Sequence, residues 1–289
     1  NKRSLLMSKI SYVNGTYCNH SNAAIHIEDR GYQFADGVYE VFAVINKKII
    51  DYDGHIKRLY RSLNEIRIES PIAKEAYLFH IKNIIKKNNI IDGLIYLQVT
   101  RGVSKRDFKF PKNIKASLVI IAKYFSMDEY HEKFKKGIKV KIVNDLRWKR
   151  VDIKTLNLLP PVLAKQQAVE YDCEEAWMID NDGYITEGSS SNAWILINDK
   201  LITTPTSNAI LNGITRTSLI KALKKNNIKL IERRFNKEDI KKANEAFITS
   251  ATQFVMPVIK IDKNLVGKGK IGKYAHIFKE AYMEAVQLK

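Results

Sequence analysis

A lysine in an apolar segment is the first residue of this sequence that could carry out chemistry. Lys154 lies in VDIKTLNLL, residues 151–159, among Val, Ile and Leu. An ammonium group with such neighbours is poorly solvated, which favours the neutral amine that attacks a carbonyl carbon and forms a Schiff base. A lysine on the outward face of a strand would give the same pattern, so Lys154 alone does not decide between the two interpretations.

Two further segments carry polar groups where a predicted element begins or ends. Glu187 comes at the end of a predicted strand, and the serine-rich turn 188–191 follows it. Thr215 opens an amphipathic helix directly after a turn at Asn212-Gly213. The free backbone N–H groups of such a helix start can bind a phosphate group.

A lysine, a carboxylate and a phosphate-binding helix start are three requirements of a pyridoxal phosphate site. The lysine holds the cofactor aldehyde as an imine, the carboxylate keeps the pyridine nitrogen protonated, and the N–H groups bind the phosphate. A further predicted strand, FITSAT at 247–252, ends in the hydroxyl residues Ser250 and Thr252. Each feature is common alone, but together they suggest this cofactor.

Longer motifs, in this order, resemble those of the class IV (fold type IV) pyridoxal phosphate aminotransferases, and most closely their D-amino acid branch. The matching stretches are EDRGYQFADGVYEV, HIKRLYRS, YLQVTRG, DLRWKRVDIKTLNLLPPVLAKQQA, TEGSSSNAW, GITRTSLI, TSAT and MPVIKID. The resemblance implies an α+β fold of two domains with pyridoxal 5'-phosphate as cofactor. It also implies a homodimer that moves amino groups between a D-amino acid such as D-alanine and a 2-oxo acid, either 2-oxoglutarate or pyruvate.

The same resemblance assigns roles to individual residues. Lys154 would hold the cofactor as a Schiff base and shuttle protons, while Glu187, beside the turn Ser189–Ser191, would pair with the pyridine nitrogen. The other cofactor contacts that it implies are Arg58, Leu211, Ile214, Thr215, Ser250 and Thr252. The substrate contacts that it implies are Tyr39, Arg106 and Phe108.

Two positions depart from the family pattern. Ala251 stands where the family usually has threonine, so Ser250, Thr252 or backbone N–H groups must bind the phosphate instead. Phe108 stands where the D-amino acid branch has histidine, two residues after Arg106, so the carboxylate trap lacks one donor. Branched-chain L-amino acid aminotransferase and aminodeoxychorismate lyase activities therefore stay open as alternatives.

The hydrophobic pattern predicts the elements that must position these residues. Short strand-like runs with a turn at Asn14-Gly15 open the chain, two helical segments follow, and two more strands end this part. Segment 127–137 is charged and poor in apolar residues, which predicts an interdomain connection. We therefore expect an N-terminal α+β domain at 1–126 and a C-terminal α/β domain at 138–289 that carries the cofactor lysine.

The net charge of +18 raises the alternative of a basic nucleic-acid-binding protein without catalytic activity. The basic residues, however, are spread along the whole chain in stretches such as NIIKKNNI and KALKKNNIK, mostly on the polar side of helical patterns. Nucleic-acid sites usually also show aromatic or arginine-rich clustering. A solvated surface rich in lysine explains the charge better, and we expect no nucleic-acid partner.

Membrane spans, disulfides and metal sites leave recognisable sequence signals. No apolar run approaches the roughly 18 residues of a membrane span, and the first apolar block is too short for a signal peptide. Cys18 and Cys173 are far apart and form no CxxC motif, so we expect reduced thiols. His55, His80 and His131 lack metal-ligand spacing. We therefore expect a cytoplasmic protein without a membrane segment or a metal ion.

Overall fold

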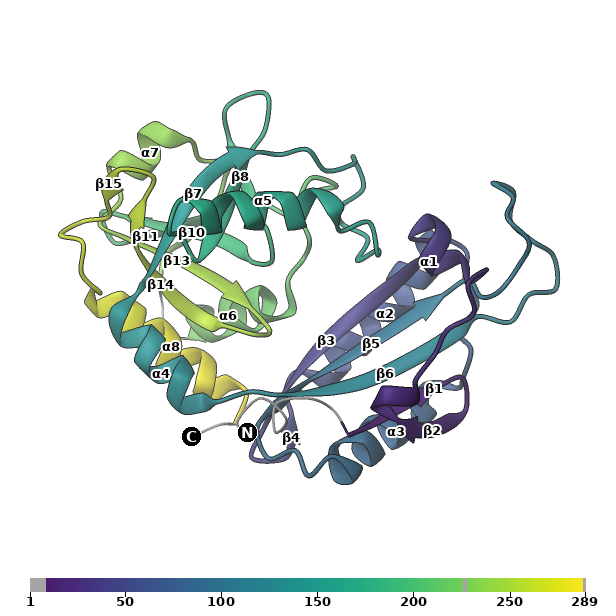
Figure 1. Cartoon of the computed structure of the whole chain (residues 1–289). Coiled ribbons are helices and arrows are strands. Elements are labelled where there is room, and N and C mark those ends of the chain that lie inside the picture. The colour runs from purple at the N-terminus through teal and green to yellow at the C-terminus, as the bar shows by residue number, and fades with distance from the viewer. Residues whose placement is uncertain (1–8, 226–227, 288–289) are drawn as a thin grey trace. The chain divides into compact units, whose positions relative to one another are not determined.

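The computed structural model describes residues 9–225 and 228–287, in which the chain forms two compact units (Figure 1). The first unit consists of Asn1–Ser126 and Ile153–Asn157. The second unit consists of Met127–Asp152 and Leu158–Lys289. Both units combine helices with a sheet, as the α+β prediction requires.

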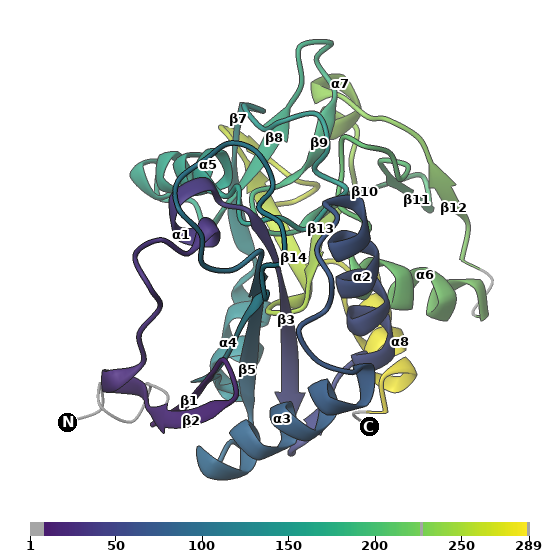
Figure 2. The same cartoon turned by 90° about the vertical axis from the view of Figure 1, so that its right-hand side faces the viewer.

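The first unit is built on an antiparallel sheet with the strand order β2-β1-β6-β5-β3-β4. Its strands are β1 (Ile10–Val13), β2 (Thr16–Asn19), β3 (Gly37–Ile45), β4 (Lys48–Ile49), β5 (Gly93–Thr100) and β6 (Ser117–Tyr124). Its helices are η2 (His20–Asn22), α1 (Arg30–Phe34), α2 (Tyr52–Glu65) and α3 (Lys74–Lys87). Figure 2 shows α2 running alongside β3.

Alternation along β3 gives this sheet two different faces. Val38 and Phe42 are fully buried in the core with the apolar sides of α2 and α3. Tyr39 and Val41, one position out of phase, are only half-buried on the opposite face. Because side chains alternate with a period of two, the neighbouring strand β5 places Tyr96 and Gln98 on this second face too.

The second unit contains a mixed sheet that has nine strands among the described residues, in the order β12-β11-β10-β13-β14-β7-β8-β9 with β15 beside β14. Its strands are β7 (Ile138–Asn144), β8 (Glu175–Ile179), β9 (Ile185–Gly188), β10 (Asn192–Ile197), β11 (Lys200–Thr203), β12 (Leu230–Glu232), β13 (Glu245–Ser250), β14 (Phe254–Ile261) and β15 (Asn264–Leu265). Its helices are α4 (Met127–Lys136), α5 (Leu159–Glu170), α6 (Ile214–Lys225), α7 (Lys237–Lys241) and α8 (Lys273–Ala285). Helix α5 packs on β7 and β8, while α4 lies beside α8 (Figure 1).

The expected interdomain connection at 127–137 is instead largely helix α4, which belongs to the second unit. Tyr130 and Phe134 are both buried, and their spacing of four residues places them on one side of that helix. The Tyr130 hydroxyl donates a hydrogen bond to the carbonyl oxygen of Val255 at 3.0 Å. Two aromatic anchors therefore dock a helix whose other residues are mostly charged.

The segment around Lys154 also differs from the prediction, because it packs with the first unit and is not the end of a regular strand. The N–H of Tyr39 donates to the carbonyl oxygen of Lys154 at 3.1 Å, and the N–H of Leu156 donates to that of Gly37 at 3.1 Å. A Cβ atom at Gly37 would lie only 2.9 Å from the Leu156 side chain, so a glycine permits this close pairing. The stretch therefore extends the edge of β3 by a single bridge between Val38 and Thr155.

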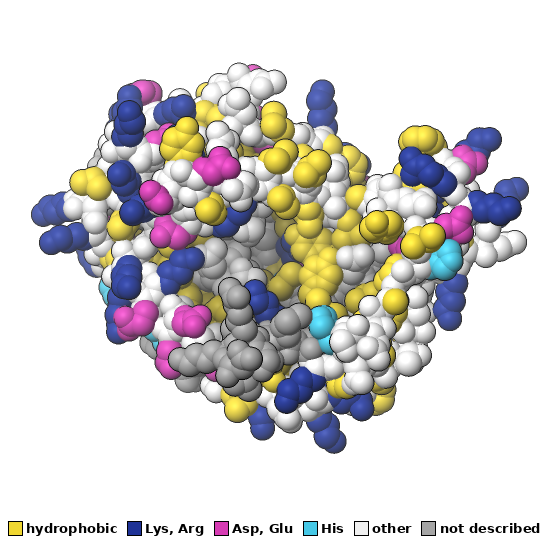
Figure 3. All heavy atoms as spheres, in the orientation of Figure 1, with side chains coloured by type: hydrophobic (Ala, Val, Ile, Leu, Met, Phe, Trp, Pro, Cys, Tyr) yellow, Lys and Arg dark blue, Asp and Glu magenta, His cyan; other side chains and the backbone are white. Residues whose placement is uncertain are grey.

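Across residues 9–225 and 228–287, none of the helices has both the length and the hydropathy needed to cross a bilayer. The same residues hold no group of three or more His, Cys, Asp or Glu side chains arranged to bind a metal ion. Figure 3 shows Lys and Arg side chains spread over the face in view with acidic side chains among them. On this face the positive charge is therefore dispersed.

Candidate functional site

Lys154 is held by its backbone while its side chain stays available. Its N–H donates to Ser62 Oγ at 3.3 Å, and its carbonyl oxygen accepts from β3. Its Nζ lies 4.1 Å from the centroid of the Tyr39 ring, within the range of a cation–π contact. The pairing with β3 thus directs the amine onto the open face of the first unit's sheet.

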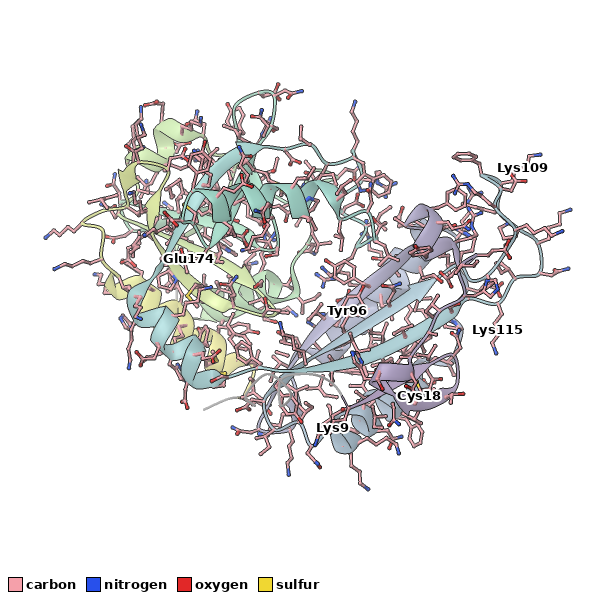
Figure 4. All side chains as sticks on the ribbon, viewed as in Figure 1. Lys9, Cys18, Tyr96, Lys109, Lys115 and Glu174 are labelled. Atoms are coloured by element: carbon pink, nitrogen blue, oxygen red, sulfur yellow. The ribbon has the colours of Figure 1, made fainter. Side chains whose placement is uncertain are left out.

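Two tyrosines and a glutamine surround this position on the open face. The rings of Tyr39 and Tyr96 are stacked with centroids 5.6 Å apart. The Tyr96 hydroxyl donates to Gln98 Oε1 at 2.6 Å, and Figure 4 labels Tyr96 on β5. Burial, with a smaller contribution from Tyr39, raises the pKa of Tyr96 to about 12, so this hydroxyl stays protonated and can donate.

Arg58, the expected phosphate ligand, is anchored by a buried carboxylate. Its Nε and Nη2 each lie 2.7 Å from an oxygen of Glu40, and His55 Nδ1 lies 2.7 Å from the same carboxylate. Burial alone would raise the pKa of Glu40, but the Arg58 guanidinium, with His55, lowers it to about 2. Glu40 therefore stays ionised and fixes the orientation of Arg58 through a fork-like pair.

Glu40→Gln should lower the free energy of unfolding at neutral pH by about 3 kcal/mol, because it leaves the buried Arg58 without its counter-charge. The lowered pKa of Glu40 stabilises the fold fully above the ordinary value of 4.5, and this contribution is lost as the pH falls toward about 2. Urea unfolding between pH 7 and pH 3 should therefore show a weaker pH dependence in the variant. Glu65→Gln, which removes an exposed partner of Arg61, is the control and should change little.

Arg106 and Phe108 lie in the loop between β5 and β6, part of which, between Lys109 and Lys115, extends beyond the strand ends (Figure 4). The Arg106 guanidinium lies 4.5 Å from the centroid of the Phe34 ring, and the Phe108 ring packs edge-on against Phe34 at 5.5 Å. The Phe108 side chain is 82% exposed. Among the described residues neither Arg106 nor Phe108 makes a ring contact or hydrogen bond with Tyr39, so the expected trap is not assembled around Tyr39.

In the second unit, Glu187 is the centre of a buried polar network. Its Oε1 accepts hydrogen bonds from Arg147 Nη1 and from the Leu211 N–H, the latter at 3.0 Å. Its Oε2 accepts from Asn192 Nδ2 at 2.9 Å. Burial raises the pKa of Glu187, and the Arg147 guanidinium opposes this by favouring the ionised form. Arg147 is itself held by Asp145, with Nη2 2.7 Å from Oδ2.

Asn192 connects this carboxylate with the start of α6. Its Nδ2 also donates to the carbonyl oxygen of Leu211 at 2.9 Å. A Cβ atom at Gly213 would lie 2.1 Å from Asn192 Oδ1, so only glycine lets the turn approach this closely. Helix α6 begins at Ile214, and Thr215 in its first turn is buried. The strand pair β9–β10 and the helix start are thereby fixed together.

The remaining hydroxyl residues fall into two groups. Ser250 Oγ and Thr252 Oγ1 are 3.3 Å apart at the end of β13, where Ser250 also accepts from the Gln253 N–H at 3.1 Å. The hydroxyls of Ser189, Ser190 and Ser191 all donate to the fully buried carboxylate of Glu175, the last two at 3.0 Å. The serine turn therefore contacts Glu175 through its side chains, although it follows Glu187 in sequence.

The structure brings the expected residues together in two sets. Lys154 and Tyr39 are in contact in the first unit, and Glu187, Leu211 and the start of α6 are linked in the second. The sequence prediction missed the residues that hold these groups in place. Those residues are Glu40, His55, Asp145, Arg147, Glu175 and Asn192.

Comparison with known proteins gives a consistent family. Residues 37–261 match the family model described as amino-transferase class IV. D-alanine aminotransferase of Staphylococcus haemolyticus is 37% identical over 283 residues, which cover 97% of this chain and 99% of that protein. The D-alanine aminotransferase of Bacillus licheniformis is 38% identical over 259 residues and covers 90% of both chains.

Solved structures show the same architecture. The branched-chain amino acid aminotransferase of Escherichia coli superposes with a TM-score of 0.91 at 22% identity, covering 96% of this chain and 95% of that one. The branched-chain amino acid aminotransferase of T.th., complexed with N-(5'-phosphopyridoxyl)-L-glutamate, reaches a TM-score of 0.89 at 26% identity and covers 97% and 95%. The similarity thus extends over nearly the whole of each chain.

Proposed function

Because the chain belongs to the class IV aminotransferase family, we propose that it transfers amino groups between D-amino acids, such as D-alanine, and 2-oxo acids, such as 2-oxoglutarate or pyruvate. Family membership makes it a transaminase that depends on pyridoxal phosphate. The preference for a D-amino acid rests on the identity of 36–38% to D-alanine aminotransferases over at least 90% of the chain. The substrate-carboxylate residues Arg106 and Phe108 have the weakest structural support.

The side chains of both units fit the cofactor. Lys154 in the first unit presents an amine on an open face, and Arg58 presents a guanidinium anchored by Glu40. In the second unit, the ionised Glu187 would accept the N–H of a protonated pyridine ring. The N-terminus of α6 at Ile214 and Thr215 offers backbone N–H groups for the phosphate, and Ser250 and Thr252 offer hydroxyls.

Bound pyridoxal phosphate supplies a carbon that carries the amino group and a ring that accepts electrons. Lys154 Nζ would take the proton from the substrate Cα and return it in the reverse half-reaction. Glu187 would hold a proton on the ring nitrogen, and Arg147 supports this role because it favours the ionised carboxylate. Leu211, whose N–H is fixed on Glu187, would pack against the ring.

We further propose that the enzyme is a cytoplasmic homodimer. Leu159, Val162 and Leu163 on α5 are 67%, 57% and 54% exposed, although all three are apolar. A second copy of the chain would cover such a surface, which monomeric proteins seldom leave uncovered. Cys18 and Cys173 are free thiols in different units, which is consistent with a reducing compartment.

Amino-group transfer from a panel of donors tests the proposed substrate class. We expect D-alanine to give a kcat/KM at least tenfold above that of L-leucine, L-isoleucine or L-valine with 2-oxoglutarate as acceptor. Pyruvate formation from D-alanine and glutamate formation from 2-oxoglutarate should be measured in the same reactions. A preference for the branched-chain L-amino acids, or turnover of aminodeoxychorismate alone, would contradict the proposal and favour one of the two alternatives.

A further inference from the structure

We propose that the side-chain amide of Gln98 binds the carboxylate of the amino acid substrate and that Tyr96 positions this amide. The inference rests on the proposed function, since it concerns the substrate of the Lys154 site. It adds a specificity-determining residue on β5 that the sequence motifs did not indicate.

The position of Gln98 follows from the strand register. Gln98 is the direct partner of Tyr39 in the antiparallel pair β3–β5, so both side chains point to the same face of the sheet. Directly opposite residues have Cβ atoms about 4.5–5.5 Å apart. Because Lys154 Nζ lies 4.1 Å from the centroid of the Tyr39 ring, Gln98 belongs to the immediate surroundings of the amine.

The contact with Tyr96 determines which end of the amide is available. The Tyr96 hydroxyl donates to Gln98 Oε1 at 2.6 Å, so the amide oxygen is occupied and the amide nitrogen is turned away from Tyr96. In the described part of the first unit, neither Gln98 Nε2 nor the Tyr39 hydroxyl has a hydrogen-bond partner. Two neighbouring donor groups are therefore open on the face that holds Lys154.

A carboxylate is the ligand that fits two open donors. Both of its oxygens only accept hydrogen bonds, and a bond from N–H or O–H to an ionised oxygen is about twice as strong as a neutral one. Phe108 can supply no donor, and the Arg106 guanidinium packs on Phe34. The donors of Gln98 and Tyr39 lie on rigid strands, so they are oriented before the substrate arrives.

Four variants of the holoenzyme test this inference. Gln98→Leu should raise the KM for D-alanine about tenfold, which is about 1.4 kcal/mol, with a smaller change in kcat. Gln98→Glu should raise it further, because a second carboxylate repels the substrate. Tyr96→Phe should raise KM less than Gln98→Leu. The double variant Tyr96→Phe/Gln98→Leu should be no worse than Gln98→Leu alone, because Tyr96 acts through the amide.

Binding of propionate, which carries the carboxylate without the amino group, provides a readout independent of turnover. Calorimetry should show roughly tenfold weaker binding of propionate by Gln98→Leu than by the wild type. Gln166→Leu, which replaces an exposed glutamine on α5, is the matched control and should bind propionate normally. Equal melting temperatures of the variants would exclude a folding effect.

The outcomes separate this inference from the proposed function. An active wild type whose KM and propionate affinity stay within twofold in Gln98→Leu would overturn the role of Gln98 and leave the proposed function intact. Additive effects of the Tyr96 and Gln98 changes would overturn the positioning role of Tyr96. A wild type that transfers no amino group from D-alanine would refute the proposed substrate class, and the propionate titration would still decide on Gln98.

Discussion

Replacing Lys154 with alanine should lower kcat for amino-group transfer by roughly 10⁴-fold or more, because one amine serves both as the attachment point of the cofactor and as the proton carrier at Cα. The fold should be unaffected. The Lys154 backbone groups bonded to Ser62 and β3 are unchanged by the substitution, and its side chain is only half-buried. Stopped-flow measurement of a single half-reaction with D-alanine would give the rate of the proton-transfer step.

Two controls make the Lys154 result specific. Lys149→Ala removes an exposed lysine five positions earlier and should retain wild-type kcat. Added methylamine should restore part of the activity of Lys154→Ala, because a small free amine can accept the Cα proton if the site is intact. A Lys154→Ala enzyme with kcat within tenfold of the wild type would rule out the proposed role.

Replacing Glu187 with glutamine should lower kcat by about 10²- to 10³-fold, because a neutral amide cannot hold a proton on the pyridine nitrogen. The cost in stability should be smaller, about 1–3 kcal/mol, for the disturbed hydrogen bonds with Leu211 and Asn192. Arg147 would keep its counter-charge, since Asp145 accepts from both its Nε and its Nη2. Activity and folding should therefore separate clearly.

The matched control for Glu187 is another carboxylate that pairs with a buried arginine in the same unit. Glu232 Oε1 lies 2.6 Å from Nη2 of the buried Arg216. Glu232→Gln should lower the melting temperature by an amount similar to that caused by Glu187→Gln, with kcat nearly unchanged. If Glu187→Gln lost rate only in proportion to folded protein, its role would be structural.

Local signals in the sequence were sufficient for several elements of the fold. The turn at Asn14-Gly15 was predicted from its dipeptide, and both residues have positive φ, 46° and 98°, in the tight hairpin β1–β2. The helix start at Ile214 follows a glycine as expected. Helix α4 was missed because only two of its side chains, Tyr130 and Phe134, are buried, and ten residues with so few apolar positions resemble a linker.

The support of the candidate site was harder to predict, because it depends on contacts between distant segments. Glu40 lies at an inward position of β3 between Val38 and Phe42, so the alternation pattern could have marked it as a buried acid that needs a partner. No comparable signal marks Arg147 or Asn192, whose partners are up to 40 residues away in sequence. The pairing of Lys154 with β3 likewise joins segments more than 100 residues apart.

Peptide mapping after borohydride reduction tests the central claim, that Lys154 holds pyridoxal phosphate in an aminotransferase, most directly. Wild-type protein loaded with pyridoxal phosphate should lose its visible absorbance on reduction. Tandem mass spectrometry should then place the phosphopyridoxyl group on Lys154, and reduced Lys154→Ala should carry no stoichiometric adduct. A stoichiometric adduct on any other lysine, or none on the wild type, would contradict the account.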